Sequence, residues 1–220
     1  MKLKKIASLA LAGIMAVSML AGCKDGTNQE DPSSSSQVPT TANVVTYAND
    51  ALTGAQKNVY TFHDNSALNQ ALQAVATDKT KCTAQKIEDA YAKYTWTTQD
   101  NNLRADVKGK LDGGLTFQDD YYKFDNYSVP GNNGKTLNYI EVSLLSGELS
   151  EKAVAEIAAK YFAKHMSNLA DSATVGTDKY ALSYSADISA IKVESPQNSA
   201  KTAWVVAVMI TKTATQQVNA

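Results

Sequence analysis

Near its C-terminal end the chain contains eight consecutive apolar residues, Ala203 to Ile210, and this run constrains the fold more than any other feature. Its β-branched residues favour an extended strand. A strand that is apolar on both sides is buried on both faces, which is typical of a position inside a sheet. The sequence therefore predicts a sheet with residues 203–210 as a central strand.

Further strands are expected where β-branched and aromatic residues lie between glycine or asparagine turn signals. The segments that satisfy this pattern are residues 94–98, 114–118, 121–127 and 137–145, with residues 118–120 as a hairpin turn. Closer to the C-terminus, Leu182 and Tyr184 alternate with polar residues, and Ile191 to Glu194 leads into a loop at residues 195–199.

Helices are expected where apolar residues recur every three or four positions. Such spacing covers residues 44–59, and Ser66 and Thr83 are placed to cap a second and a third helix in an up-and-down front half. The clearest helix follows Ser150, with Leu149 placed to pack onto Val154. The fold class expected is α+β: an antiparallel sheet with helices packed on it, after a disordered N-terminal tether.

The N-terminal region has a different pattern from the rest of the chain. Residues 1–5 are basic, residues 6–20 are mostly apolar, and Leu20-Ala21-Gly22-Cys23 follows. This apolar segment is shorter than the roughly 20 residues that span a bilayer, which favours a signal peptide. The run 20–23 resembles the lipobox of bacterial lipoproteins. Other interpretations are a secretory signal with a chance cysteine and an uncleaved membrane helix.

The resemblance implies that residues 1–22 are removed and that Cys23 becomes the lipidated first residue, carrying palmitate-type acyl chains. Two acyl chains anchor a protein stably, where one is marginal. Residues 24–41 contain a run of four serines, two prolines and one aliphatic residue, too little to form a core. We therefore expect a tether at 23–41, one globular domain at 42–215 and a tail at 216–220, outside the cytoplasm on a cell membrane, with a Gram-positive surface favoured.

Charge argues against a nucleic-acid partner. Of the 21 Lys and Arg residues, three lie in residues 1–22, so the rest of the chain carries 18 basic against 22 acidic side chains. Nucleic-acid-binding proteins gather basic residues on one face, whereas the lysines here are scattered among acids. The expected partners are the membrane, through the lipid, and a glycan, a wall peptide or a protein.

Few residues suit catalysis. The two histidines, His63 and His165, lie outside any nucleophile motif, and His165 falls on an apolar helix face, which is typical of a core residue. Neither metal-ligand motifs nor phosphate-binding loops are found, so no metal, catalytic residue or cofactor is predicted. With Cys23 lipidated, Cys82 has no partner in the chain; we interpret it as a packing residue, the alternative being a reactive thiol or an intermolecular disulfide.

Residues 117–127 contain five aromatic and three acidic residues. If residues 121–127 form a strand, alternation turns Phe124 to the core and Tyr121, Asp125 and Tyr127 outward, as a candidate binding surface. The alternative is ordinary cross-strand packing.

The sequence as a whole favours a cell-envelope lipoprotein that displays a non-enzymatic binding or accessory domain. One alternative is an envelope hydrolase acting on wall or peptide substrates. Another is the solute-binding component of a transporter.

Overall fold

The apolar run lies within strand β5 (Thr202–Gln216), which pairs with β4 (Asp178–Glu194) on one side and with β2 (Thr136–Ser146) on the other. Both pairings are antiparallel, and the central position predicted for residues 203–210 is confirmed. These observations come from a computed structural model that describes residues 41–97, 99–111, 113–126, 136–166 and 169–217.

The described sheet has five strands in the order β1-β4-β5-β2, with β3 (Ser172–Val175) also pairing with β4. β1 (Phe62–His63) runs parallel to β4, so the sheet is mixed, although its long pairings are antiparallel. Gly176 has a φ of 62° in the tight turn from β3 to β4, a conformation that favours glycine. The α+β class is confirmed.

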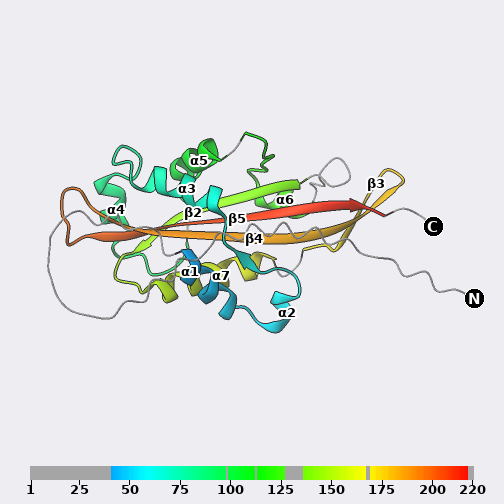
Figure 1. Ribbon diagram of the computed structural model, residues 1–220, viewed down its shortest axis with the longest axis horizontal. Coiled ribbons are helices and arrows are strands. Elements are labelled where there is room, and N and C mark those ends of the chain that lie inside the picture. The colour runs from blue at the N-terminus through cyan, green and yellow to red at the C-terminus, as the bar shows by residue number, and fades with distance from the viewer. Residues whose placement is uncertain (1–40, 98, 112, 127–135, 167–168, 218–220) are drawn as a thin grey trace, which may run out of the picture. The chain divides into compact units, whose positions relative to one another are not determined.

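Helices cover both faces of this sheet (Figure 1). On one face lie α1 (Thr41–Asp50) and α7 (Glu151–Met166); on the other lie α3 (Ser66–Ala76), α4 (Ala84–Ala90) and α5 (Asn101–Lys110). Along β5, Val206 and Val208 pack toward α1 and α7, whereas Val205 and Ala207 pack toward α3, α4 and α5, as strand alternation requires. The up-and-down front half predicted from the sequence is therefore wrong, because α1 and α3 lie on opposite faces.

Local capping explains where most helices begin. Thr83 Oγ1 accepts a hydrogen bond from the Lys86 N–H, and Ser150 Oγ accepts one from the Ala153 N–H, so both predicted caps are confirmed. For α3 the cap is Asn65 rather than Ser66. The expected helix over residues 44–59 is divided into α1 and the short α2 (Gly54–Lys57).

Three predicted strands are absent from the described sheet. Residues 94–97 are irregular, and residues 114–118 contain one isolated bridge, between Phe117 and Asn138. Residues 121–126 form helix α6 (Tyr121–Asn126), in which Phe124 is fully buried. The burial predicted for Phe124 is confirmed, but the strand that was to produce it is wrong. Residue 127 lies outside the described part of the chain.

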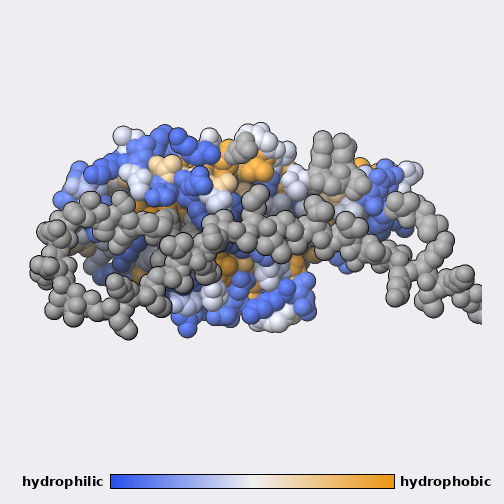
Figure 2. All heavy atoms as spheres, in the orientation of Figure 1, coloured by the Kyte–Doolittle hydropathy of each residue, from blue (hydrophilic) through white to orange (hydrophobic). Residues whose placement is uncertain are grey.

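On the face shown in Figure 2, the outer surfaces of the helices are mainly hydrophilic, and hydrophobic residues appear between them. The sheet separates the buried apolar residues into two clusters, one under each layer of helices. The cluster under α1 and α7 contains the features described next.

Candidate functional site

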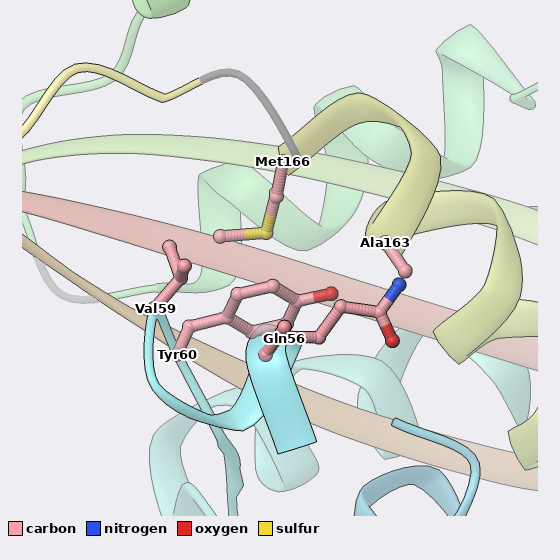
Figure 3. A pocket seen from close by; sticks show the side chains of 6 residues that line it. Gln56, Val59, Tyr60, Ala163 and Met166 are labelled. Atoms are coloured by element: carbon pink, nitrogen blue, oxygen red, sulfur yellow. The ribbon is translucent and has the colours of Figure 1, made fainter. Parts of the chain in front are cut away.

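A pocket of about 250 Å³ opens between the end of α7 and the segment that contains α2 (Figure 3). Its inner part is formed by buried side chains and its rim by the exposed Ala55 and Val59, the latter 42% exposed. The residues that line it are Ala55, Gln56, Val59, Tyr60, Ala163 and Met166. Cavities that take up a small apolar molecule can be smaller, about 150 Å³ for one that binds benzene.

Two local devices hold the α2 side of this pocket. Thr53 and Gln56 form a capping box, in which the Gln56 side chain accepts from the Thr53 N–H at 2.8 Å and the Thr53 hydroxyl accepts from the Gln56 N–H at 3.3 Å. Beyond the pocket, the Asn49 amide donates to the Phe62 carbonyl and accepts from the Phe62 N–H, both at 2.8 Å. The segment between α1 and β1 is therefore fixed at its start and end.

Tyr60 is the unusual residue of the pocket. Its side chain is 3% exposed, and its ring packs edge-on against Phe62 with 5.6 Å between centroids. Within the described part of the chain, no group hydrogen-bonds the Tyr60 hydroxyl. Burial raises the pKa of Tyr60 to about 12, so the hydroxyl stays protonated at neutral pH. A buried hydroxyl without a partner is costly, and such a group in a folded protein calls for an explanation.

The pocket is also uncharged. None of the six lining side chains is ionised at neutral pH: four are apolar, one is an amide and one is a neutral phenol. Moving a charged group into such surroundings is strongly unfavourable. The lining therefore suits a neutral molecule, and the side chains in it that can form hydrogen bonds are those of Tyr60 and Gln56.

A second buried polar feature lies deeper, on the α7 face of β2. Glu141 is 6% exposed and accepts hydrogen bonds from Trp96 Nε1 at 3.0 Å and from the Tyr139 hydroxyl at 2.6 Å. Burial, together with the charge of Glu141 and a hydrogen bond to it, raises the pKa of Tyr161 to about 12. Glu141 thus has three donors around it, and we interpret the cluster as a structural network that joins β2 to α7.

His63 is exposed, and its Nε2 lies 3.1 Å from Thr61 Oγ1. The parallel register places His63 beside Asp187, whose Oδ2 accepts from the Asn65 side chain at 2.9 Å. Burial raises the pKa of Asp187, and the hydrogen bond from Asn65 makes this increase smaller. The Asp187 carboxylate thus helps to hold Asn65, the cap of α3. In a catalytic triad, the acid would instead hydrogen-bond the histidine and orient it.

His165 lies at the edge of the α7 core cluster, half-buried between two tyrosines. Its ring is 4.6 Å from that of Tyr161 and 5.2 Å from that of Tyr121, centroid to centroid. The Tyr121 hydroxyl donates to the His165 backbone oxygen at 2.7 Å. Tyr121 therefore fastens α6 to α7 rather than lying on an outward strand face. Of the other two residues of the candidate surface, the side chain of Asp125 and the whole of Tyr127 lie outside the described part of the chain.

Cys82 is 2% exposed, and burial raises the pKa of its thiol to about 11, an effect that nearby Lys86 reduces. A protonated, inaccessible thiol is a poor nucleophile, which agrees with the packing interpretation. Among the described residues, no cluster of three His, Cys, Asp or Glu side chains suits a metal ion. No helix formed by those residues is both long and apolar enough to cross a bilayer.

Sequence reasoning missed both the pocket and the Glu141 network. In the run Tyr139-Ile140-Glu141-Val142-Ser143, alternation alone indicates a solvent face containing Glu141, because it does not register that α7 covers that face. Tyr60 carried no signal, since Ala163 and Met166, which complete the pocket, come from a distant helix.

Comparison with protein-family models, curated proteins and solved structures finds no match to this chain.

Proposed function

We propose that this chain is a cell-envelope lipoprotein, anchored through Cys23 and facing outside the cytoplasm. The support is the order of a basic start, a short apolar segment and Leu20-Ala21-Gly22-Cys23, followed by a polar segment of tether composition. Cys23→Ala should move the protein from the detergent phase to unprocessed or shed material. Partition into the detergent phase that is unchanged by the substitution would contradict the anchor.

The folded domain is, in this proposal, a non-enzymatic binding domain, and its site is the pocket between α2 and α7. One observation carries it: an apolar pocket of about 250 Å³ is lined by a buried tyrosine whose hydroxyl lacks a partner among the described residues. Apolar pockets with a few polar groups are the usual form of small-molecule sites.

An envelope hydrolase is supported less well by the same residues. It would use His63 or His165 together with an acid or Cys82, but the acid beside His63, Asp187, is engaged with Asn65, and the His165 ring packs between Tyr121 and Tyr161. It could not easily use Cys82, whose thiol is buried and protonated. A solute-binding component of a transporter would use the same pocket, and copurification of a membrane transporter would distinguish it.

The proposal predicts that 4-(dimethylamino)benzonitrile, a neutral single-ring dye whose emission strengthens in apolar surroundings, fluoresces more strongly with the unlipidated domain. Val59→Trp places a large ring at the exposed rim and should reduce this enhancement without disturbing the core. Ala163→Leu fills the inner part, and Ala153→Leu is its control, since Ala153 lies on the same helix outside the pocket. An enhancement equal in wild type, Val59→Trp and folded Ala163→Leu would exclude the pocket as the site.

A further inference from the structure

The Tyr60 hydroxyl defines what kind of molecule the pocket can select. A neutral phenol donates one strong hydrogen bond, and here that donor has no acceptor among the described residues. In Figure 3 the hydroxyl end of Tyr60 lies toward Gln56 and Ala163, two other residues of the lining. The unused Tyr60 donor thus lies within the wall of the pocket. A molecule that occupies the pocket could supply the acceptor for it.

Access to this donor requires a small rearrangement. The hydroxyl oxygen is inaccessible to water, so neighbouring side chains cover it. Gln56 and Met166, which line the same pocket, are both unbranched, and side chains of this kind change rotamer readily to fit a ligand. Gln56 keeps its carboxamide oxygen on the Thr53 N–H in the ligand-free domain, at 2.8 Å. A ligand that enters past Val59 can displace the end of Gln56 and reach Tyr60.

The uncharged lining also disfavours charged ligands. A carboxylate or an ammonium in the pocket would lose its hydration without gaining an ionic partner, because the lining has no ionised side chain. A hydrocarbon would be accepted, but it would leave the Tyr60 donor unused. A ketone, ester or ether oxygen satisfies the donor, and the hydrogen bond that it accepts offsets the loss of its hydration.

We propose that the pocket between α2 and α7 selects a small neutral molecule with an apolar body and one hydrogen-bond acceptor, which receives the Tyr60 hydroxyl proton in a hydrogen bond. The proposal rests on the pocket being the binding site, and it adds the class of ligand. Size follows from the volume of about 250 Å³, which suits a single ring or a short chain.

The methionines provide a direct test. Beyond residue 22 the chain has two of them, Met166 in the pocket and Met209 in the core cluster on the opposite face of the sheet. Methyl-labelled methionine in the chain from residue 23, with Cys23→Ser to prevent lipidation, therefore gives one reporter signal and one internal control. This chain contains the whole compact unit of residues 37–220. The probes are cyclohexanone, cyclohexane and cyclohexanecarboxylate, titrated at neutral pH.

The expected result is that cyclohexanone shifts the Met166 signal and leaves Met209 unchanged. Cyclohexane should bind about three- to tenfold more weakly, the range that one net hydrogen bond provides, and the carboxylate should not bind. Tyr60→Phe should reduce the affinity for cyclohexanone to that for cyclohexane or below, because the ketone oxygen is then buried without a donor. Tyr184→Phe, which removes a hydroxyl that donates to the Ala170 carbonyl, should change neither affinity.

Two failures are distinguishable. If cyclohexanone and cyclohexane shift Met166 with equal affinity, or if Tyr60→Phe leaves their ratio unchanged, the ligand class is wrong but the pocket remains the site. If no probe shifts Met166 in the wild-type protein, the proposed site itself is overturned.

Discussion

Removing a single hydroxyl from Tyr60 and, separately, from Tyr139 should change the stability of the domain in opposite directions. The two side chains are each 3% exposed, so substitution by phenylalanine deletes the same atom from equally buried positions. They differ in what the hydroxyl contacts. The Tyr139 hydroxyl donates to Glu141 Oε1 at 2.6 Å, whereas the Tyr60 hydroxyl has no partner in the described part of the chain.

The magnitudes follow from these contacts. Tyr139→Phe deprives a buried carboxylate of one of its donors, and a hydrogen bond to a charged group contributes about 1.5–3 kcal/mol. Tyr60→Phe removes a buried hydroxyl that no described residue hydrogen-bonds, and burying such a group costs roughly 1–3 kcal/mol in mutational data. Since the adjoining pocket lets the structure relax, we take about 1 kcal/mol as the expected gain. For a domain of this size, 1 kcal/mol corresponds to about 2–4 °C in Tm.

Thermal and urea unfolding of the unlipidated protein, followed by circular dichroism, would measure both changes. Tyr60→Phe should raise Tm by about 2–4 °C and Tyr139→Phe should lower it by about 3–12 °C, with unchanged urea m values. Equal destabilisation by the two substitutions would show that the Tyr60 hydroxyl has a partner in the ligand-free protein. The inference about the ligand would then lose its basis.

Three further predictions concern the rest of the domain. Phe124→Ala should cost about 3–5 kcal/mol in urea unfolding, because the ring is fully buried; a loss below about 1 kcal/mol would mean that α6 is not packed as described. Gly147→Ala should destabilise by at least about 1–3 kcal/mol, since an added Cβ would overlap Thr202 Oγ1 and lie 2.5 Å from the Thr202 backbone, and an unchanged Tm would contradict that close approach. Burial raises the pKa of Asp100, but the Lys86 ammonium and the N–H groups of α5 lower it more, so its net pKa is below the usual value. Its stabilising contribution is therefore present above about pH 4 and lost as the pH falls through the folded-state pKa, so Asp100→Asn, which can still cap α5, should lower Tm at neutral pH and have a progressively smaller effect as the pH falls below about 4.

Where strong local signals agreed with burial, the sequence was a reliable guide. The run at residues 203–210 predicted a central strand, because only a strand covered on both faces accommodates uninterrupted apolar residues. Ser150 and Thr83 predicted helix starts, because a cap acts within a few residues of its own position. These features depend on neighbours along the chain.

Short segments were decided by tertiary contacts instead. Residues 121–126 have the composition of a strand, but the Tyr121 hydroxyl reaches the backbone of α7 and Phe124 packs on Tyr139, and these contacts outweigh the weak preference of a six-residue segment. Similarly, the paired asparagines Asn101 and Asn102 suggested a turn, whereas Asp100 caps a helix there.

The candidate site belongs wholly to the tertiary structure. Tyr60 meets Ala163 and Met166 because α1 and α7 pack on the same face of the sheet, and no periodicity in the sequence records that proximity. Among the described residues its hydroxyl finds no partner, because the surrounding side chains, drawn from two distant segments, are apolar or already engaged. Composition and spacing determine which segments must be buried, but which groups face one another inside is determined by how the helices dock on the sheet.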